Sequence, residues 1–161
     1  MITRSQALAL VHKELGTTDR YGHSLSVAKR MQDLAAVFNA DAEEWYLTGL
    51  LHDIDLERTK NEMSRHGVLA QLMLKGMLPS QALLAIEAHD YRTGVHSDTR
   101  IAQALRFADT VDNLQPRIGQ DALEAAVDTG EWKDLIDGHP DMEDRLRAVK
   151  DFVKRWPSVT V

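Results

Sequence analysis

The sequence contains no cysteine, and this absence excludes two kinds of structure. A chain without thiols can neither form disulfides nor hold a metal through thiolate ligands. Any bound metal must therefore have nitrogen or oxygen ligands. The lack of cysteine also fits a reducing compartment, so we expect a cytoplasmic protein.

Long apolar runs and an excess of positive charge are also lacking. No stretch approaches the roughly 18 apolar residues that a membrane span needs. Residues 1–15 have charges within an amphipathic helical pattern, so we expect neither a signal peptide nor a membrane protein. The net charge of −6 argues against broad nucleic-acid binding, which depends on Lys and Arg contacts to phosphates. A small phosphorylated substrate stays compatible with this charge, because a metal can supply positive charge locally.

Strand signals are sparse, whereas helical periodicity recurs along the chain. With 161 residues, 43% of them apolar, the chain is long enough to bury its own core. The sequence predicts an all-α, single-domain helical bundle over 1–161, with a core motif region 19–115 and a helical appendage 116–161. The expected helices span 4–15, 19–39, 42–52, 64–76, 80–89, 98–113, 119–128 and 142–155.

Several histidines and aspartates occupy positions where the helical pattern expects apolar side chains. His23 lies four residues before Val27 on an apolar stripe, and the pair His52–Asp53 ends an apolar segment. One buried histidine is usually a satisfied core residue, but six such groups facing one core would need many separate hydrogen-bond partners. One or two divalent cations would satisfy them together. The six positions are His23, His52, Asp53, His66, His89 and Asp109.

The ligand types indicate which metals to expect. Imidazoles and carboxylates without thiolates suit first-row transition metals better than calcium. We therefore expect one or two divalent ions, with iron or manganese favoured over zinc, nickel or cobalt. The remaining histidines, His12, His96 and His139, are expected at the surface or in polar loops, outside the site.

The order of these residues resembles the signature of a known superfamily. Four positions resemble the H…HD…D pattern of the HD-domain superfamily of metal-dependent phosphohydrolases: His23 in "YGHSLSVA", His52 and Asp53 in "LLHDID", and Asp109 in "FADTVD". The other two resemble the additional histidines of its two-metal branch: His66 in "RHGVLA" and His89 in "EAHDYR".

The resemblance covers residues 19–115. Within the superfamily, the chain is similar to short single-domain HDIG-type proteins, including symmetrical diadenosine tetraphosphate hydrolases. The resemblance implies an all-α bundle with the ligands at its centre. It also implies that one metal is held by His23, His52, Asp53 and Asp109, and a second by His66 and His89 with Asp53 bridging.

The chain departs from the HDIG-type pattern directly after the HD pair. Many members continue with Ile, a small residue and Lys, where this chain has Ile54, Asp55 and Leu56. The Gly-Tyr-Pro motif of cyclic-di-GMP phosphodiesterases is also absent, so we do not expect that activity. Asp55, Asp90 and Asp112 lie near the ligands in sequence, where they could orient ligand histidines or cap helices.

The expected activity is hydrolysis of a phosphate ester or anhydride of a nucleotide-like substrate by a metal-activated water. His52 and Asp53 are the expected catalytic residues. Basic residues near the ligands are the candidates for holding substrate phosphates, namely Arg58, Lys60, Arg65 and Arg92. Two alternatives stay open: a mixed-valence di-iron oxygenase, and a non-catalytic regulatory module that binds a metal or nucleotide. A homodimer is also compatible with the sequence.

Overall fold

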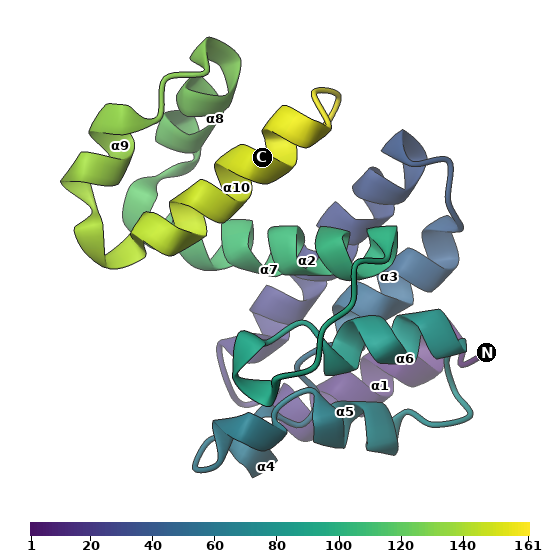
Figure 1. The fold of residues 1–161 in the computed structure, drawn as a ribbon. Helices are drawn as coiled ribbons and strands as arrows, with labels where there is room; N and C mark the ends of the chain where they lie inside the picture. Colours follow the sequence, from purple (N-terminus) through teal and green to yellow (C-terminus); the bar gives the residue numbers. More distant parts are fainter. The chain divides into compact units, whose positions relative to one another are not determined.

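The computed structural model describes all of residues 1–161 and contains ten α-helices, three short 3₁₀ helices and no strand (Figure 1). The prediction of an all-α fold is therefore confirmed. The chain divides into two compact units, Met1–Ala108 and Asp109–Val161. The expectation that residues 1–161 form one domain stays a prediction.

The boundary between the two units falls within helix α7 (Arg100–Ile118). The other elements of the first unit are α1 (Arg4–Leu15), α2 (Arg20–Val37), α3 (Ala42–Leu51), α4 (Leu56–Thr59), η1 (Met63–Arg65), α5 (Val68–Met73), α6 (Ser80–Glu87) and η2 (Tyr91–Thr93). Those of the second unit are α8 (Gln120–Thr129), α9 (Lys133–Gly138), η3 (Pro140–Met142) and α10 (Glu143–Arg155). None of these helices has the length and apolar character that a membrane crossing requires.

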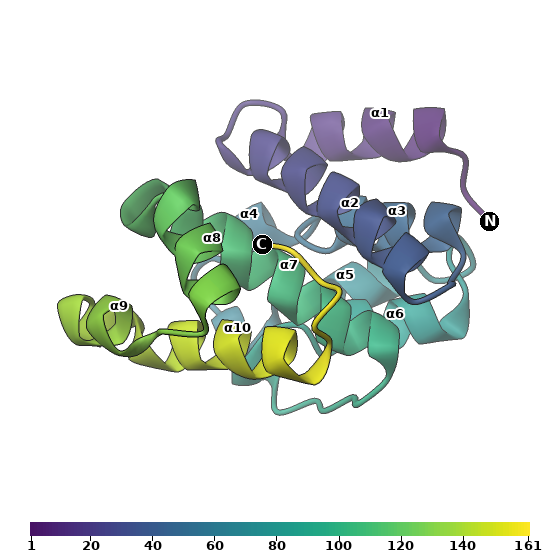
Figure 2. The ribbon, with the colours of Figure 1, turned by 90° about the horizontal axis from the view of Figure 1, so that it is seen from above.

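Helices α2 and α3 lie side by side in both views of the ribbon (Figures 1 and 2). A glycine allows this close approach. A Cβ atom on Gly49 would lie 2.9 Å from the Cα atom of Ala28 and 2.9 Å from the carbonyl oxygen of Val27. The two helices run in opposite directions, so the beginning of α2 and the end of α3 meet, which brings His23 close to His52.

The start of α3 is fixed by the side chain of Asp41. The Asp41 carboxylate accepts hydrogen bonds from the main-chain N–H groups of Glu43 and Glu44 at 2.9 and 3.0 Å. The apolar side chains of α3 are almost completely buried and belong to a continuous core. Large, fully buried members of this core in the first unit are Leu15, Met31, Leu47, Leu50, Leu51, Ile54, Leu74, Ile86 and Leu105.

The prediction of one helix over 64–76 is wrong in its first half. His66 has extended backbone angles (φ −64°, ψ 131°), and Gly67 has a φ of +85°, so α5 begins only at Val68. A Cβ atom on Gly67 would lie 2.7 Å from the carbonyl oxygen of Ile86. The positive φ and this close approach both require glycine here, and the positive φ prevents one continuous helix through residue 67. His66 therefore points from a turn, not from a helical stripe.

The predicted end of the 98–113 helix is also wrong, because α7 continues through Pro116 to Ile118. Proline lacks an N–H group and removes one helical hydrogen bond, but it sits within the last turn of α7. Burial of Val111 and Leu114 continues the apolar stripe past residue 113 and favours the longer helix. The helix ends where Gly119 adopts a φ of +88°.

The second unit has its own apolar core. Helix α10 buries Leu146, Val149, Phe152 and Val153 on one face, following helical spacing. Helix α9 lies between the expected helices 119–128 and 142–155, and it was not predicted. The sequence pattern of α9 is short and mostly polar, which leaves periodicity little to detect.

Candidate metal centre

Two of the predicted ligand histidines are oriented by main-chain carbonyls. The Nδ1 atom of His52 lies 2.7 Å from the carbonyl oxygen of Gly49, and that of His89 lies 2.7 Å from the carbonyl oxygen of Ile86. Because a carbonyl oxygen only accepts hydrogen bonds, each Nδ1 carries the ring proton. A neutral ring then has its lone pair on Nε2, which is the atom that faces the centre of the cluster.

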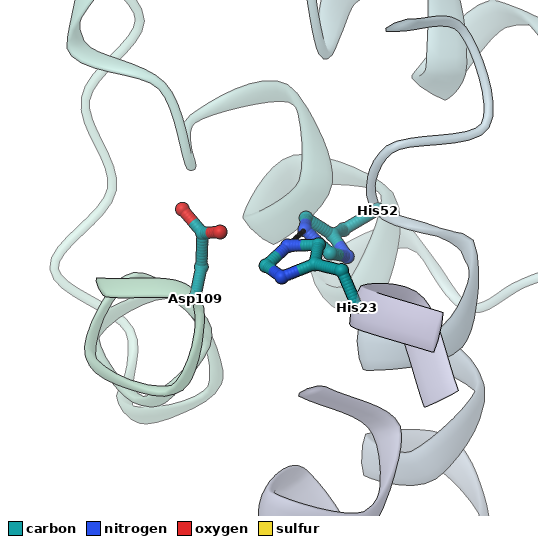
Figure 3. Close-up of side chains that lie close together, drawn as sticks. All are labelled: His23, His52 and Asp109. Carbon is teal, nitrogen blue, oxygen red and sulfur yellow. Dashed lines mark hydrogen bonds between the residues drawn. The ribbon is translucent and has the colours of Figure 1, made fainter. Parts of the chain in front are cut away.

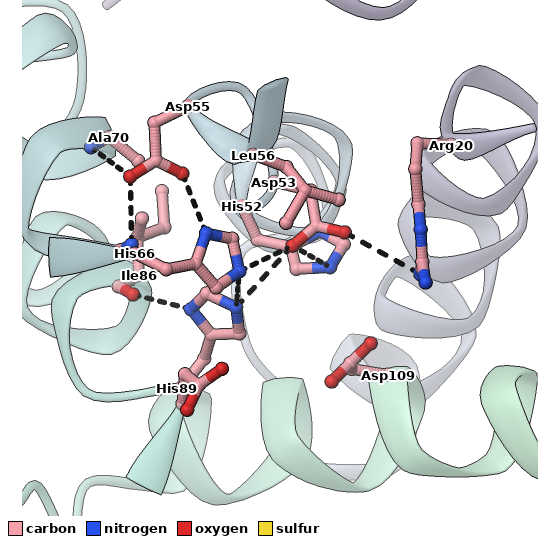
Figure 4. A network of polar contacts seen from close by, with 12 residues as sticks. Arg20, His52, Asp53, Asp55, Leu56, His66, Ala70, Ile86, His89 and Asp109 are labelled. Carbon is pink, nitrogen blue, oxygen red and sulfur yellow. Dashed lines mark hydrogen bonds and ion pairs between the residues drawn. The ribbon is translucent and has the colours of Figure 1, made fainter. Parts of the chain in front are cut away.

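A third histidine is oriented by Asp55. The Nδ1 atom of His66 lies 2.9 Å from Oδ1 of Asp55, whose other oxygen accepts hydrogen bonds from the N–H groups of Gly67 and Ala70 at 2.9 and 3.1 Å (Figure 4). Asp55 is completely buried. This one carboxylate therefore holds both the His66 ring and the first turn of α5.

These three rings converge on Asp53 (Figure 4). Its Oδ1 atom lies 3.1 Å from Nε2 of His66, 3.3 Å from Nε2 of His52 and 3.5 Å from Nε2 of His89. The Nε2 atoms of His66 and His89 are only 3.2 Å apart. Lone pairs and a carboxylate at these distances repel one another unless a proton or a cation lies between them.

The predicted ligand His23 also lies close to His52 and Asp53. Its Nε2 atom is 3.3 Å from Nε2 of His52 and 3.6 Å from Oδ2 of Asp53. His23, His52 and Asp109 each offer a ligand atom, and these atoms lie within 4.8 Å of one another (Figure 3). The Asp109 carboxylate is oriented by Asn113, whose Nδ2 donates to its Oδ1 at 2.7 Å.

The structure thus brings together all six predicted ligands, although they come from distant parts of the sequence. Besides the group of His23, His52 and Asp109, the ligand atoms of His52, Asp53 and His89 also lie within 4.8 Å of one another. The side chains of the four histidines and of Asp53 are all more than nine-tenths buried. Assignment of individual residues as metal ligands stays a prediction.

The pKa values of Asp53 and His66 depend on each other. Burial favours the neutral carboxyl group, but the nearby imidazoles of His52, His66 and His89 outweigh it and hold the pKa of Asp53 well below its ordinary value. Burial likewise opposes protonation of His66, but hydrogen bonds to Asp53 and Asp55 raise its pKa to about 10. Without a metal ion, a proton between His66 and Asp53 therefore offsets the repulsion at the centre.

The chemistry of these groups fits a divalent metal. All six side chains offer imidazole nitrogen or carboxylate oxygen, and three of the imidazoles donate the outer hydrogen bond that metal-bound histidines typically make. The two groups of His and Asp side chains in this chain could each hold such an ion. The three remaining histidines, His12, His96 and His139, lie outside both clusters.

The four basic residues predicted to hold substrate phosphates form ion pairs with nearby carboxylates. Nη2 of Arg58 donates to both carboxylate oxygens of Glu14, at 2.8 and 2.9 Å. The other pairs are Lys60 with Glu57 at 3.0 Å, Arg65 with Glu62 at 3.3 Å, and Arg92 with Asp90. These ion pairs involve carboxylates other than those of Asp53 and Asp109. The role of the four residues in substrate binding stays a prediction.

A basic residue that sequence reasoning missed lies beside the cluster. Nη1 of Arg20 is 3.9 Å from Oδ2 of Asp53, and 41% of the Arg20 side chain is exposed to solvent (Figure 4). Arg20 precedes His23 by three residues on α2, so the two side chains share a helical face. This spacing was the available signal, but it is a common one and does not by itself distinguish Arg20 from other arginines.

Comparisons with known proteins agree with this geometry. A family model described as "HD domain" matches residues 20–114. A symmetrical bis(5′-nucleosyl)-tetraphosphatase from Halalkalibacterium halodurans is 39% identical over 62 residues, which is 38% of this chain and only 33% of that relative. The match thus spans about a third of the length of the curated relative.

A solved structure shares the fold. It is the crystal structure of a protein from Clostridium acetobutylicum described as a predicted HD superfamily hydrolase involved in NAD metabolism. The comparison has a TM-score of 0.57 and covers 94% of this chain and 99% of that one, at 22% sequence identity. At this identity, the likeness shows the fold alone. Because the family model covers more than half of the sequence, the chain belongs to the HD domain family.

Proposed function

We propose that the protein is a metal-dependent phosphohydrolase that cleaves a phosphate ester or anhydride of a nucleotide-like substrate. The single observation that supports this most strongly is the convergence of three oriented Nε2 atoms on Oδ1 of Asp53, within 3.5 Å. This arrangement is unfavourable for isolated side chains and favourable for ligands of a cation. The similarity to a symmetrical tetraphosphatase suggests a nucleotide as substrate.

The proposed ligands are the six residues of the cluster, and iron or manganese is the preferred metal, ahead of zinc, nickel or cobalt. The reason is the mixture of imidazole and carboxylate without any thiolate. When bound, a divalent cation supplies a Lewis acid that polarises a phosphoryl oxygen and makes water more acidic. The proposed ligands are His23, His52, Asp53, His66, His89 and Asp109.

The residues of the chain itself would hold charge and protons at defined atoms. The low pKa of Asp53 keeps its carboxylate ionised at neutral pH, so this group can accept a hydrogen bond from water without first losing a proton. The carbonyl of Gly49 keeps the proton of His52 on Nδ1. The guanidinium of Arg20, half-exposed beside Asp53, can donate to a phosphoryl oxygen of the substrate. Asp53 and His52 are the proposed catalytic residues.

The test is a search for turnover by protein of known metal content. The protein is purified without chelator or nickel resin, its metals are measured by elemental analysis, and it is incubated with nucleotides and with dinucleoside polyphosphates. Products are separated by anion-exchange chromatography, because symmetric cleavage of a dinucleoside tetraphosphate releases nucleoside diphosphates and no free phosphate. We expect turnover that depends on the bound metal.

Two matched variants make this test specific. Asp53→Asn removes the central carboxylate and should abolish turnover, whereas Asp33→Asn changes an exposed carboxylate that pairs with Lys29 on the surface of α2 and should leave turnover unchanged. Turnover by metal-depleted Asp53→Asn protein would refute the proposed mechanism. The absence of turnover from fully metal-loaded wild-type protein across the whole substrate set would refute the proposed function.

A further inference from the structure

Arg106 joins the two ends of the segment 88–97, which leads from α6 to α7. Its Nη1 atom donates to the carbonyl oxygen of Ala88 at 3.2 Å, and its Nη2 atom donates to the carbonyl oxygen of Ser97 at 2.8 Å. Ala88 immediately precedes His89, one of the proposed ligands. A single guanidinium on α7 therefore fixes the main chain next to the metal centre.

The charge of the Arg106 guanidinium is partly removed from solvent. The guanidinium is half-buried, and burial lowers its pKa, with the charge of Asp98 acting in the opposite direction. Its two hydrogen bonds go to neutral carbonyl groups, which compensate a buried charge less well than a carboxylate would. These hydrogen bonds constrain the main chain at Ala88 and Ser97, which an ion pair between surface side chains would not do.

The part of the segment between the two anchored carbonyls forms a turn of its own. The Asp90 carboxylate accepts hydrogen bonds from the main-chain N–H of Arg92 at 2.8 Å and from its guanidinium. The Thr93 hydroxyl donates to the carbonyl oxygen of Asp90 at 2.9 Å. The turn is thus held together internally, and Arg106 connects it to α7.

We infer that Arg106 is a positioning residue for His89. The ring of His89 is oriented from α6 by the carbonyl of Ile86, and its main chain is held from α7 through Ala88. Together these contacts place Nε2 of His89 3.2 Å from that of His66 and 3.5 Å from Oδ1 of Asp53. This inference rests on the proposed metal site and deepens it, because it links Arg106 to the cation position that includes His66 and His89.

The test measures Mn²⁺ binding to the full-length protein, without any nucleotide. Free Mn²⁺ is followed by its electron paramagnetic resonance signal during a titration of wild-type protein, Arg106→Met and Arg106→Lys. Loss of a direct partner of a ligand typically weakens metal affinity by about 10- to 100-fold. Arg106 acts through the main chain of Ala88, so we expect a loss near the lower end of this range, about 10-fold, for Arg106→Met. Arg106→Lys, which can reach one carbonyl, should lose less.

The matched control is Arg4→Met. Arg4 is also a partly buried arginine, but it pairs with Glu43 and stacks on Tyr46. Its loss should leave Mn²⁺ affinity unchanged even if the fold becomes less stable. Thermal unfolding of each variant shows whether it is folded. If Arg106→Met does not fold, Arg106→Lys is used in its place.

A double-mutant cycle with His89→Ala separates positioning from general destabilisation. If Arg106 acts through His89, Arg106→Met or Arg106→Lys should weaken Mn²⁺ binding in the wild-type background and have no further effect in His89→Ala. The inference is overturned if Mn²⁺ affinity stays within twofold of wild type, if the loss persists undiminished in His89→Ala, or if wild-type protein binds no Mn²⁺. Failure of the nucleotide assay alone would refute the proposed hydrolysis and leave this result standing.

Discussion

At the scale of single residues, the centre of the site consists of imidazole nitrogens packed around the carboxylate of Asp53. Four histidine Nε2 atoms approach its two oxygens within 3.6 Å. In His52, His66 and His89, the Nδ1 atom already makes a hydrogen bond to an oxygen outside this centre. The groups that can relieve this arrangement are protons, a cation, or the nearby guanidinium of Arg20, and each gives a measurable prediction.

Arg20 should contribute to binding of an anionic substrate. A charge-assisted hydrogen bond contributes about 1.5–3 kcal/mol, so Arg20→Ala should lower kcat/KM by roughly 10- to 100-fold, and Arg20→Lys by less. Arg20 is not a proposed metal ligand, so metal content should not change. Arg147→Ala is the control, because Arg147 is paired with Glu143 on the exposed face of α10, and it should behave like wild type. Unchanged kinetics for Arg20→Ala would show that phosphate is held elsewhere.

The raised pKa of His66 leads to a prediction of how metal binding depends on pH. Its pKa is about 10 in the folded metal-free protein, against an ordinary value of 6.5. Since the folded value is the higher one, protonated His66 stabilises the metal-free fold, fully below pH 6.5 and progressively less as the pH rises through about 10. A metal ion needs the lone pair of Nε2, so binding at pH 7.5 should release about one proton from His66.

Proton release is measured by isothermal titration calorimetry with Mn²⁺ in two buffers of different ionisation enthalpy. Wild-type protein should release more protons than His66→Gln, by about one per protein molecule. Its metal affinity should also rise between pH 6 and pH 9. Equal proton release by the two proteins would show that His66 is already neutral before the metal binds.

At the scale of elements, the approach of α2 to α3 depends on Gly49. Alanine at this position would place Cβ 2.9 Å from backbone atoms of α2, which cannot move aside as a side-chain end can. Overpacking of this kind costs about 1–3 kcal/mol, so Gly49→Ala should lower the free energy of unfolding by that amount. Because the contact lies between the helices that carry His23 and His52, metal affinity should fall as well.

The control for this prediction is Gly22→Ala. Gly22 lies within α2, and a Cβ atom there would meet nothing within 4 Å. Alanine favours a helix over glycine by about 0.5–1 kcal/mol, so this variant should be slightly more stable than wild type. Chemical denaturation of both variants checks the pair. Equal stability of the two variants would show that the helices can separate without cost.

The same elements show what sequence reasoning can and cannot predict here. Helical periodicity locates α2, α3 and α6 within a few residues, and polar residues on their apolar faces identify His23 and His52. The break at Gly67 could not be predicted, since it depends on the approach of the Ile86 carbonyl from another helix. Arg20 and Arg106 were missed because their roles depend on contacts with residues that are distant in the sequence.

At the scale of the whole molecule, the family match and the polar cluster concern the same part of the chain. The HD domain model covers residues 20–114, and all six proposed ligands lie within it. The residues beyond 114 complete α7 and form α8 to α10. The family assignment therefore describes the part of the molecule that contains the proposed chemistry, and the remaining helices belong to the second unit.

Removal of the metal should affect stability and activity together. If metal binds only the folded protein, a free concentration 100 times Kd stabilises it by about 2.7 kcal/mol. For a chain of 161 residues this raises Tm by roughly 5–10 °C. Dialysis against a chelator should therefore lower Tm by this amount and abolish nucleotide turnover, and added Mn²⁺ or Fe²⁺ should restore both.

The same experiment distinguishes the two alternative functions that the ligand set allows. A di-iron oxygenase would consume oxygen, as an oxygen electrode shows, and would release nothing from nucleotides. A regulatory module would show the metal-dependent rise in Tm with neither reaction. If one ion serves both roles, Tm and nucleotide turnover recover at the same metal concentration, because both then depend on occupation of one site by ligands that include Asp53. Recovery of Tm at a concentration where turnover stays absent would separate the stabilising ion from catalysis.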